Sequence, residues 1–179
     1  VLFVACTAKV PVQYSELDVL PVIHPAYVDI TIPYNISPLN VAYEMEGKEF
    51  VTELKAGGQS LVMKGKHTDW NLKQWHAFLE SVKGETIELH TYVKTDNGWV
   101  KYRPISWYVA EEPIDPYISY RIIAPSYVTY EELSIRQREM ASFEEQMVYN
   151  NMLLSTDKDG QCINCHSYKS YKTKKFTSF

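Results

Sequence analysis

The stretch ETIELHTYVKTDNGWVKYRPISWYVAEE, residues 85–112, decides the fold class of this 179-residue chain. Two runs rich in β-branched and aromatic residues flank Asp96-Asn97-Gly98, a turn sequence that favours a tight connection between antiparallel strands. The stretch therefore predicts a β-hairpin. Pro104 interrupts the second arm, and because proline has no N–H to donate to a neighbouring strand, it predicts an edge strand or a bulge at that point.

Other segments of strand length precede this hairpin. Residues 26–33, AYVDITIP, alternate in polarity, and LNVAYEME, KEFVTELK and QSLVMKGK follow with glycine turns at 47 and 57–58. One helix is predicted between the strands. Apolar residues recur there at helical spacing before Gly84, namely Trp75, Phe78, Leu79 and Val82. Six or seven short strands with one inserted helix predict a mainly β chain, with an antiparallel β-sandwich over residues 26–112.

The chain changes character on either side of the predicted sandwich. Residues 1–25 read as the remnant of a signal segment followed by a proline-containing tether. Residues 113–179 begin with a proline-rich linker, and Thr129–Glu132 and Ser142–Glu145 then match the spacing of capping boxes. These predict two short helices, at about 130–139 and 142–153, which form a helical connector leading to a cysteine motif.

Composition excludes some classes of function. A formal net charge of -4 gives no basic field, so nucleic acid is not an expected partner. No apolar run approaches the roughly 20 residues of a membrane helix. The opening VLFVACTAK, however, is similar to the end of a bacterial lipoprotein signal, in which the cysteine after a small residue becomes lipidated. Cys6 is therefore the expected lipid anchor; a truncated strand with a buried cysteine is the alternative.

The strongest chemical signal is Cys162-Ile163-Asn164-Cys165-His166, a C-x-x-C-H motif. Two thiols three residues apart reach the two vinyl groups of one porphyrin, and the following histidine reaches the iron. The motif predicts covalent haem c, with Cys162 and Cys165 as anchors and His166 as the proximal ligand. No Ser/His/Asp order and no phosphate-binding loop accompanies the motif, so an electron carrier is expected rather than a stand-alone catalyst.

Three alternatives to haem remain open. A structural disulfide between Cys162 and Cys165 is the strongest of them. A zinc site needs a fourth ligand that the motif does not supply. A redox-active C-x-x-C pair is usually placed at the start of a helix in a βαβ unit, and no such unit is predicted here.

The sixth ligand of a haem iron has to come from elsewhere, because no methionine or histidine follows the motif. Met147 and Met152 are the preferred distal ligands, since the segment that carries them leads directly into the motif. Further candidates are Met140 and four scattered histidines: His24, His67, His76 and His90.

Three stretches in this order, EEPIDPYISYRIIAPSY, SIRQREMASFEEQMVYNNML and CINCHSY, make the chain resemble a group of exported Bacteroidota lipoproteins. In that group a β-rich segment, a linker and a C-x-N-C-H-S motif precede a TolB-like or WD40-like β-propeller. The resemblance implies haem attachment at Cys162, Cys165 and His166 and a lipid anchor at Cys6. It also implies a chain that stops before its propeller, which could hold the distal ligand.

The expected function is electron transfer or redox sensing by a lipid-anchored protein of the periplasm or cell surface, on the outer membrane, with a redox protein as partner. The alternative is a non-enzymatic scaffold lipoprotein that binds a glycan or a protein, with Cys162 and Cys165 in a disulfide. Trp70, Trp99 and Trp107 are its candidate stacking residues, although an aromatic core is the simpler interpretation of each.

Overall fold

The computed structural model describes residues 8–123, 133–153, 166–168 and 176–178. The chain divides into two compact units, Val1–Pro113 and Ile114–Phe179, and each is described by itself. The secondary structure of the described residues is mainly strand, with one short helix, which confirms the predicted mainly β class. No helix in the described residues is long and apolar enough to cross a membrane.

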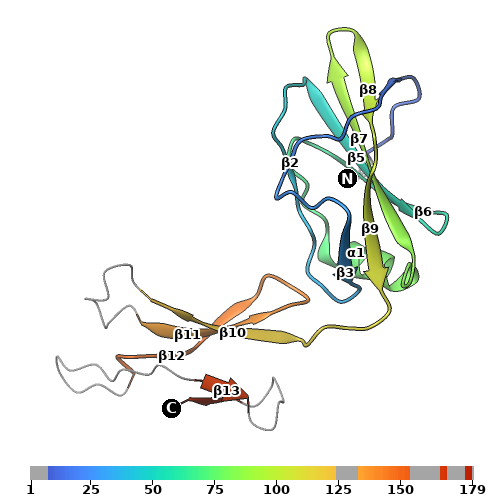
Figure 1. Ribbon diagram of the computed structural model, residues 1–179. Coiled ribbons are helices and arrows are strands. Elements are labelled where there is room, and N and C mark those ends of the chain that lie inside the picture. The colour runs from blue at the N-terminus through green and yellow to red at the C-terminus, as the bar shows by residue number, and fades with distance from the viewer. Residues whose placement is uncertain (1–7, 124–132, 154–165, 169–175, 179) are drawn as a thin grey trace, which may run out of the picture. The chain divides into compact units, whose positions relative to one another are not determined.

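The first unit is built on one mixed sheet (Figure 1). Its central path runs in the order β1-β8-β7-β5-β6, and β9 joins β7 while β3 joins β9. The pairs β1–β8 and β3–β9 are parallel and the others are antiparallel. The seven strands are β1 (Ser15–Leu17), β3 (Ile30–Pro33), β5 (Glu49–Ala56), β6 (Gln59–Lys64), β7 (Thr86–Thr95), β8 (Gly98–Tyr102) and β9 (Ile105–Ala110).

The predicted hairpin is present, and Pro104 divides its second arm into β8 and β9. Leu89 pairs with Ile105, and Tyr92 pairs with Lys101. Between these two pairs the chain advances three residues along β7 but four along the other arm. The second arm therefore holds one extra residue beside Pro104, which is the predicted bulge.

One face of the sheet forms the core. Alternate residues of the adjacent strands β5 and β7 point to this face. They lie side by side in pairs, among them Phe50–Val93 and Leu54–Leu89. The helix α1 (Leu72–Ser81) buries Trp75, Phe78 and Leu79 in the same cluster. Asn71 caps α1, because its side-chain oxygen accepts a hydrogen bond from the backbone N–H three residues later.

A two-stranded sheet of β2 (Ile23–His24) and β4 (Ala42–Tyr43) adds to this core. The buried hydroxyl of Tyr43 lies 2.6 Å from the hydroxyl of Thr52 and 3.1 Å from that of Thr91. Tyr43 thereby ties the small sheet to the core face of β5 and β7. The predicted strand at 39–46 is thus only two residues long, and the predicted tether contributes both β1 and β2.

The second unit contains an antiparallel sheet in the order β10-β11-β12 and a separate pair of short strands, β13 and β14. Gln137 of β11 lies opposite Gln146 of β12, and their side-chain amides form a hydrogen bond of 3.0 Å. The strands are β10 (Tyr117–Ile122), β11 (Ser134–Glu139), β12 (Glu145–Asn150), β13 (His166–Tyr168) and β14 (Phe176–Ser178).

The prediction of helices at 130–139 and 142–153 is wrong where the structure describes these residues. The Ser142 hydroxyl does accept from the N–H of Glu144, but it also donates to the Glu139 carboxylate, and the N–H of Glu139 bonds to the carbonyl of Glu144. These bonds close a turn between β11 and β12. A serine that accepts a local N–H bond suits a turn as well as a helix start, so the capping-box spacing was ambiguous. Thr129 and Glu132, the other capping pair, lie outside the described residues.

Candidate functional site

The residues predicted to attach haem are only partly placed. Cys162, Cys165 and the predicted lipid anchor Cys6 lie outside the described residues. His166 is the first residue of β13 and pairs with Ser178 of β14. Within the described residues, no group of three or more His, Cys, Asp and Glu side chains is arranged to hold a metal ion.

The two preferred distal ligands are solvent-exposed. Met147, in β12, is 57% exposed, and Met152, just after β12, is 40% exposed. Neither methionine is packed in the described core. The four candidate histidines all lie in the first unit, where His24 and His67 are exposed and His90 is buried. Met140, half-buried, follows β11 in the second unit.

The tryptophans divide sharply by burial. Trp70, Trp75 and Trp107 are core residues, each at most 6% exposed. The indole N–H groups of Trp75 and Trp107 donate to backbone carbonyls of Ile36 and Tyr27 at 2.9 and 2.8 Å. Trp99 of β8 is half-buried. Burial therefore excludes the predicted stacking role for Trp70 and Trp107, and of the three candidates Trp99 is the one with an accessible ring.

Strand register builds a polar cluster on the outer face of the large sheet, the face opposite the core. We call Glu53, Glu88, His90, Tyr92 and Lys101 the outer-face cluster. Glu53 of β5 lies opposite His90 of β7, and Lys101 of β8 lies opposite Tyr92. The Nε2 of His90 lies 3.0 Å from a Glu88 carboxylate oxygen, and the Tyr92 phenol donates to Glu53 at 3.3 Å.

Burial dominates the electrostatics of the outer-face cluster. It lowers the pKa of His90, and the nearby Lys101 charge lowers it further, while Glu88 and Glu53 act in the opposite direction. Burial also raises the pKa of Tyr92, and the Glu53 charge adds to that effect. The Nδ1 atom of His90 is buried with no hydrogen-bond partner. At neutral pH the cluster therefore holds an uncharged imidazole and an uncharged phenol.

The outer-face cluster is also where β1 is held. The Tyr14 ring meets the Tyr92 ring edge-on, with centroids 5.3 Å apart, and the Lys101 ammonium lies 5.6 Å from the Tyr14 centroid. Lys101 also pairs with Glu16 of β1 at 3.6 Å. The cluster therefore joins β5, β7 and β8 to the N-terminal segment.

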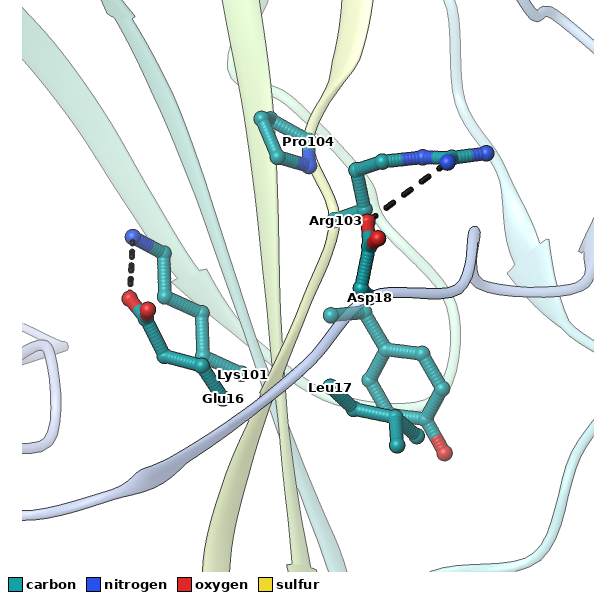
Figure 2. A pocket seen from close by; sticks show the side chains of 7 residues that line it. Glu16, Leu17, Asp18, Lys101, Arg103 and Pro104 are labelled. Atoms are coloured by element: carbon teal, nitrogen blue, oxygen red, sulfur yellow. Dashed lines mark ion pairs between the residues drawn. The ribbon is translucent and has the colours of Figure 1, made fainter.

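A shallow pocket of about 340 Å³ lies beside β1 and β8 (Figure 2). Two ion pairs border it: Lys101 with Glu16, and Arg103 with Asp18 at 3.5 Å. The N–H of Arg103 also bonds to the carbonyl of Val19 at 3.0 Å. Each cation that lines the pocket has an acidic partner on the N-terminal segment, so this arrangement is suited to fastening β1 rather than to binding an anion.

A second opening, of about 660 Å³, lies at the tip of the β7–β8 hairpin. We call it the hairpin-tip groove. Its lining residues come from the N-terminal segment and from the turn, and they are Pro11, Val12, Gln13, Tyr14, Ser15, Asn97, Gly98 and Trp99. The groove combines two aromatic rings with two amide side chains, and its lining contains no charged side chain.

Sequence reasoning missed Tyr14, Glu53 and Tyr92 because their neighbours are set by pairing between distant strands. A signal for the burial of Trp107 was present. In β9, ISWYVA, the apolar residues Ile105, Trp107 and Val109 alternate with less apolar ones, and strand alternation places all three on the core face.

Comparisons with protein-family models, curated proteins and solved structures give no match to this chain.

Proposed function

We propose that this chain is part of an exported lipoprotein that carries a covalently attached c-type haem and uses it in electron transfer or redox sensing. The single observation that carries the proposal is the sequence Cys162-x-x-Cys165-His166. Its donor set fits the group: two thiols at the spacing of the two vinyl substituents, followed by an imidazole.

Each residue has a distinct role in this proposal. The S–H groups of Cys162 and Cys165 would each add across one vinyl group of the haem, a step that forms two thioethers and loses no atom. The His166 imidazole would be the proximal ligand. Bound haem supplies a one-electron iron couple, whose potential depends on the axial ligands.

Met147 is the proposed distal ligand, with Met152 as the second choice. Their exposure supports this assignment, because a methionine packed in a core would have to leave it before binding iron. A thioether ligand raises the reduction potential of a haem relative to a second imidazole. The choice between methionine and histidine therefore has a measurable consequence.

The proposed setting follows from Cys6. A lipid on Cys6 would anchor the chain to the outer membrane, facing the periplasm or the cell surface. The oxidising environment there is compatible with haem attachment to Cys162 and Cys165 and with a disulfide between them. The partner would then be another redox protein. In this proposal the first unit is a small β-sandwich whose second layer is formed by β2, β4 and α1, and Tyr43 supports it by linking β4 to the large sheet.

One observation favours a second candidate, a non-enzymatic scaffold lipoprotein with a Cys162–Cys165 disulfide. The hairpin-tip groove presents Trp99 and Tyr14 together with amide side chains, a combination suited to binding a neutral partner such as a glycan or a protein segment.

The test is to express the chain in an exporting host with a c-type haem maturation system and to record its visible spectrum. The proposal predicts Soret and α bands that persist after denaturation. They should be absent from the Cys162→Ser/Cys165→Ser variant. Met147→Leu should alter the spectrum of the oxidised protein, and a change in Met152→Leu instead would assign the distal ligand to Met152. Free thiols, or a disulfide without haem bands, would overturn the proposal.

A further inference from the structure

We propose that the hairpin-tip groove is a saccharide-binding site for a linear chain of pyranoses whose hydroxyl groups are equatorial. This inference rests on the second function proposed above, the binding scaffold, and assigns its ligand class and its residues. The proposal is independent of haem, because the residues of the groove all lie in the first unit.

The groove exists because two segments diverge. Pairing between β1 and β8 begins with Ser15 opposite Val100, and the Ser15 hydroxyl reaches the carbonyl of Trp99 at 3.5 Å. Before Ser15 the N-terminal segment no longer pairs with the hairpin, and the space between them is the groove. The groove lies between the bend at Val12 and Gln13 and the turn at Asp96 and Asn97, and it is open rather than enclosed, so a linear chain can continue past it.

The lining favours a neutral ligand. No charged side chain lines the groove, and the two ammonium groups near its rings, those of Lys94 and Lys101, are paired with Glu49 and Glu16, so the groove offers no unpaired charge to an ionic ligand. It does offer the amides of Gln13 and Asn97, which can each donate and accept hydrogen bonds. Hydroxyl groups of a sugar have the same dual character, so the amides match them.

Two aromatic rings supply the apolar contact. Trp99 is the tryptophan among the four that the core does not enclose, and Tyr14 is 40% exposed. A pyranose with equatorial hydroxyls presents a flat patch of C–H bonds on each face of its ring. Such a patch packs on an aromatic face, whose partial negative charge attracts the C–H hydrogens. The rings and amides together therefore match both kinds of surface that a sugar presents.

The groove is also held in shape before any ligand arrives. Tyr14 is fixed by its contact with Tyr92 and by the Lys101 ammonium above its ring. The ammonium of Lys94 lies 5.9 Å from the centroid of Trp99. Gly98, with a φ of +114°, sets the turn that carries Trp99. Fixed side chains lose less conformational entropy on binding, which favours affinity.

The experiment titrates the 179-residue chain with cellohexaose, a linear chain of equatorially substituted glucose units, and follows tryptophan fluorescence and calorimetric heat. We expect saturable binding that Trp99→Ala weakens at least about tenfold, with a smaller loss for Gln13→Ala. Tyr108→Ala, an exposed tyrosine of β9 outside the groove, is the matched control and should bind like the unmodified chain. Circular dichroism checks that Trp99→Ala is folded, and Gln13→Ala tests the groove without removing a ring.

Three outcomes would overturn the inference. No heat and no fluorescence change at millimolar cellohexaose would remove the ligand class. Binding that is unchanged in both Trp99→Ala and Gln13→Ala would place the sugar elsewhere and leave the scaffold function standing. Trp99-dependent binding to phosphatidylcholine vesicles instead of cellohexaose would make the groove a lipid contact. Haem bands recorded on the same samples report separately on the first proposed function.

Discussion

The imidazole of His90 and the carboxylate of Glu88 point to the same side of β7 and meet at 3.0 Å, yet burial keeps the pKa of His90 below its usual value. Two carboxylates and one cation face this imidazole: Glu88 from its own strand, Glu53 from β5 and Lys101 from β8. Desolvation together with Lys101 therefore outweighs the attraction of the two carboxylates.

This balance predicts a pH-dependent stability. A histidine whose pKa is lowered by folding binds protons more readily when unfolded, so the free energy of unfolding falls as the pH drops below about 6.5 and through the lower folded-state pKa. We expect His90→Gln to flatten the dependence between pH 7.5 and pH 5. Urea unfolding across this range measures it. The exposed His67→Gln is the control, and an equally flat profile for that variant would contradict the assignment.

The hydroxyl of Tyr43 is predicted to stabilise the first unit. Tyr43→Phe keeps the ring, which stacks on Phe50, but leaves the buried hydroxyls of Thr52 and Thr91 without this partner. The expected loss is about 1–3 kcal/mol in the free energy of unfolding. Tyr108→Phe, at an exposed position on β9, should change it by less than about 0.5 kcal/mol. Equal losses in the two variants would show that the Tyr43 hydrogen bonds are not stabilising.

Two neighbours on β9 test the strand assignment and the core together. Trp107 is fully buried and Tyr108 is exposed, because successive strand residues face opposite sides. Trp107→Ala should cost about 3–5 kcal/mol, from lost burial and the cavity it leaves. Tyr108→Ala should cost far less. Thermal melts of both variants make the measurement, and a similar fall in the two melting temperatures would argue against this orientation of β9.

The hairpin of β11 and β12 can be distinguished from a helix by cross-linking. Gln137 and Gln146 are directly paired across the two strands, within the Cα separation that a disulfide spans. In a continuous helix the same residues would be about 13 Å apart along the axis. With Cys6, Cys162 and Cys165 replaced by serine, Gln137→Cys/Gln146→Cys should form an intramolecular disulfide on oxidation. The offset pair Gln137→Cys/Met147→Cys should form it less readily, and the reverse order would refute the register.

Local sequence chemistry predicted a large part of the first unit. The turn at Asp96-Asn97-Gly98 and the spacing of Trp75, Phe78 and Leu79 act over a few residues, and both elements are present in the structure. The helix predicted from the capping-box spacing at Ser142 was wrong, because this spacing too reports only local hydrogen bonding. The hydrogen bonds of Ser142 serve a hairpin as well as they would serve a helix cap.

The pairing of strands that are distant in the sequence could not be predicted from local sequence patterns. The three residues of β1 pair with β8, and Ser15 and Val100 are 85 positions apart in the chain. The position of Glu53 opposite His90 likewise depends on register between β5 and β7. Neither relationship leaves a pattern in its own stretch of sequence. The hairpin-tip groove, which lies between the N-terminal segment and the hairpin, was hidden in the same way.

The C-x-x-C-H motif is the strongest chemical signal in the sequence, but His166 is its one residue that the structure describes. Whether the motif carries haem therefore needs a direct measurement. The most direct is the intact mass, under denaturing conditions, of the chain exported in the presence of the c-type haem maturation system. The account predicts a mass one haem greater than that of Cys162→Ser/Cys165→Ser exported in the same way, after allowance for the two substitutions. A chain lighter by two hydrogen atoms, as a Cys162–Cys165 disulfide requires, would contradict it.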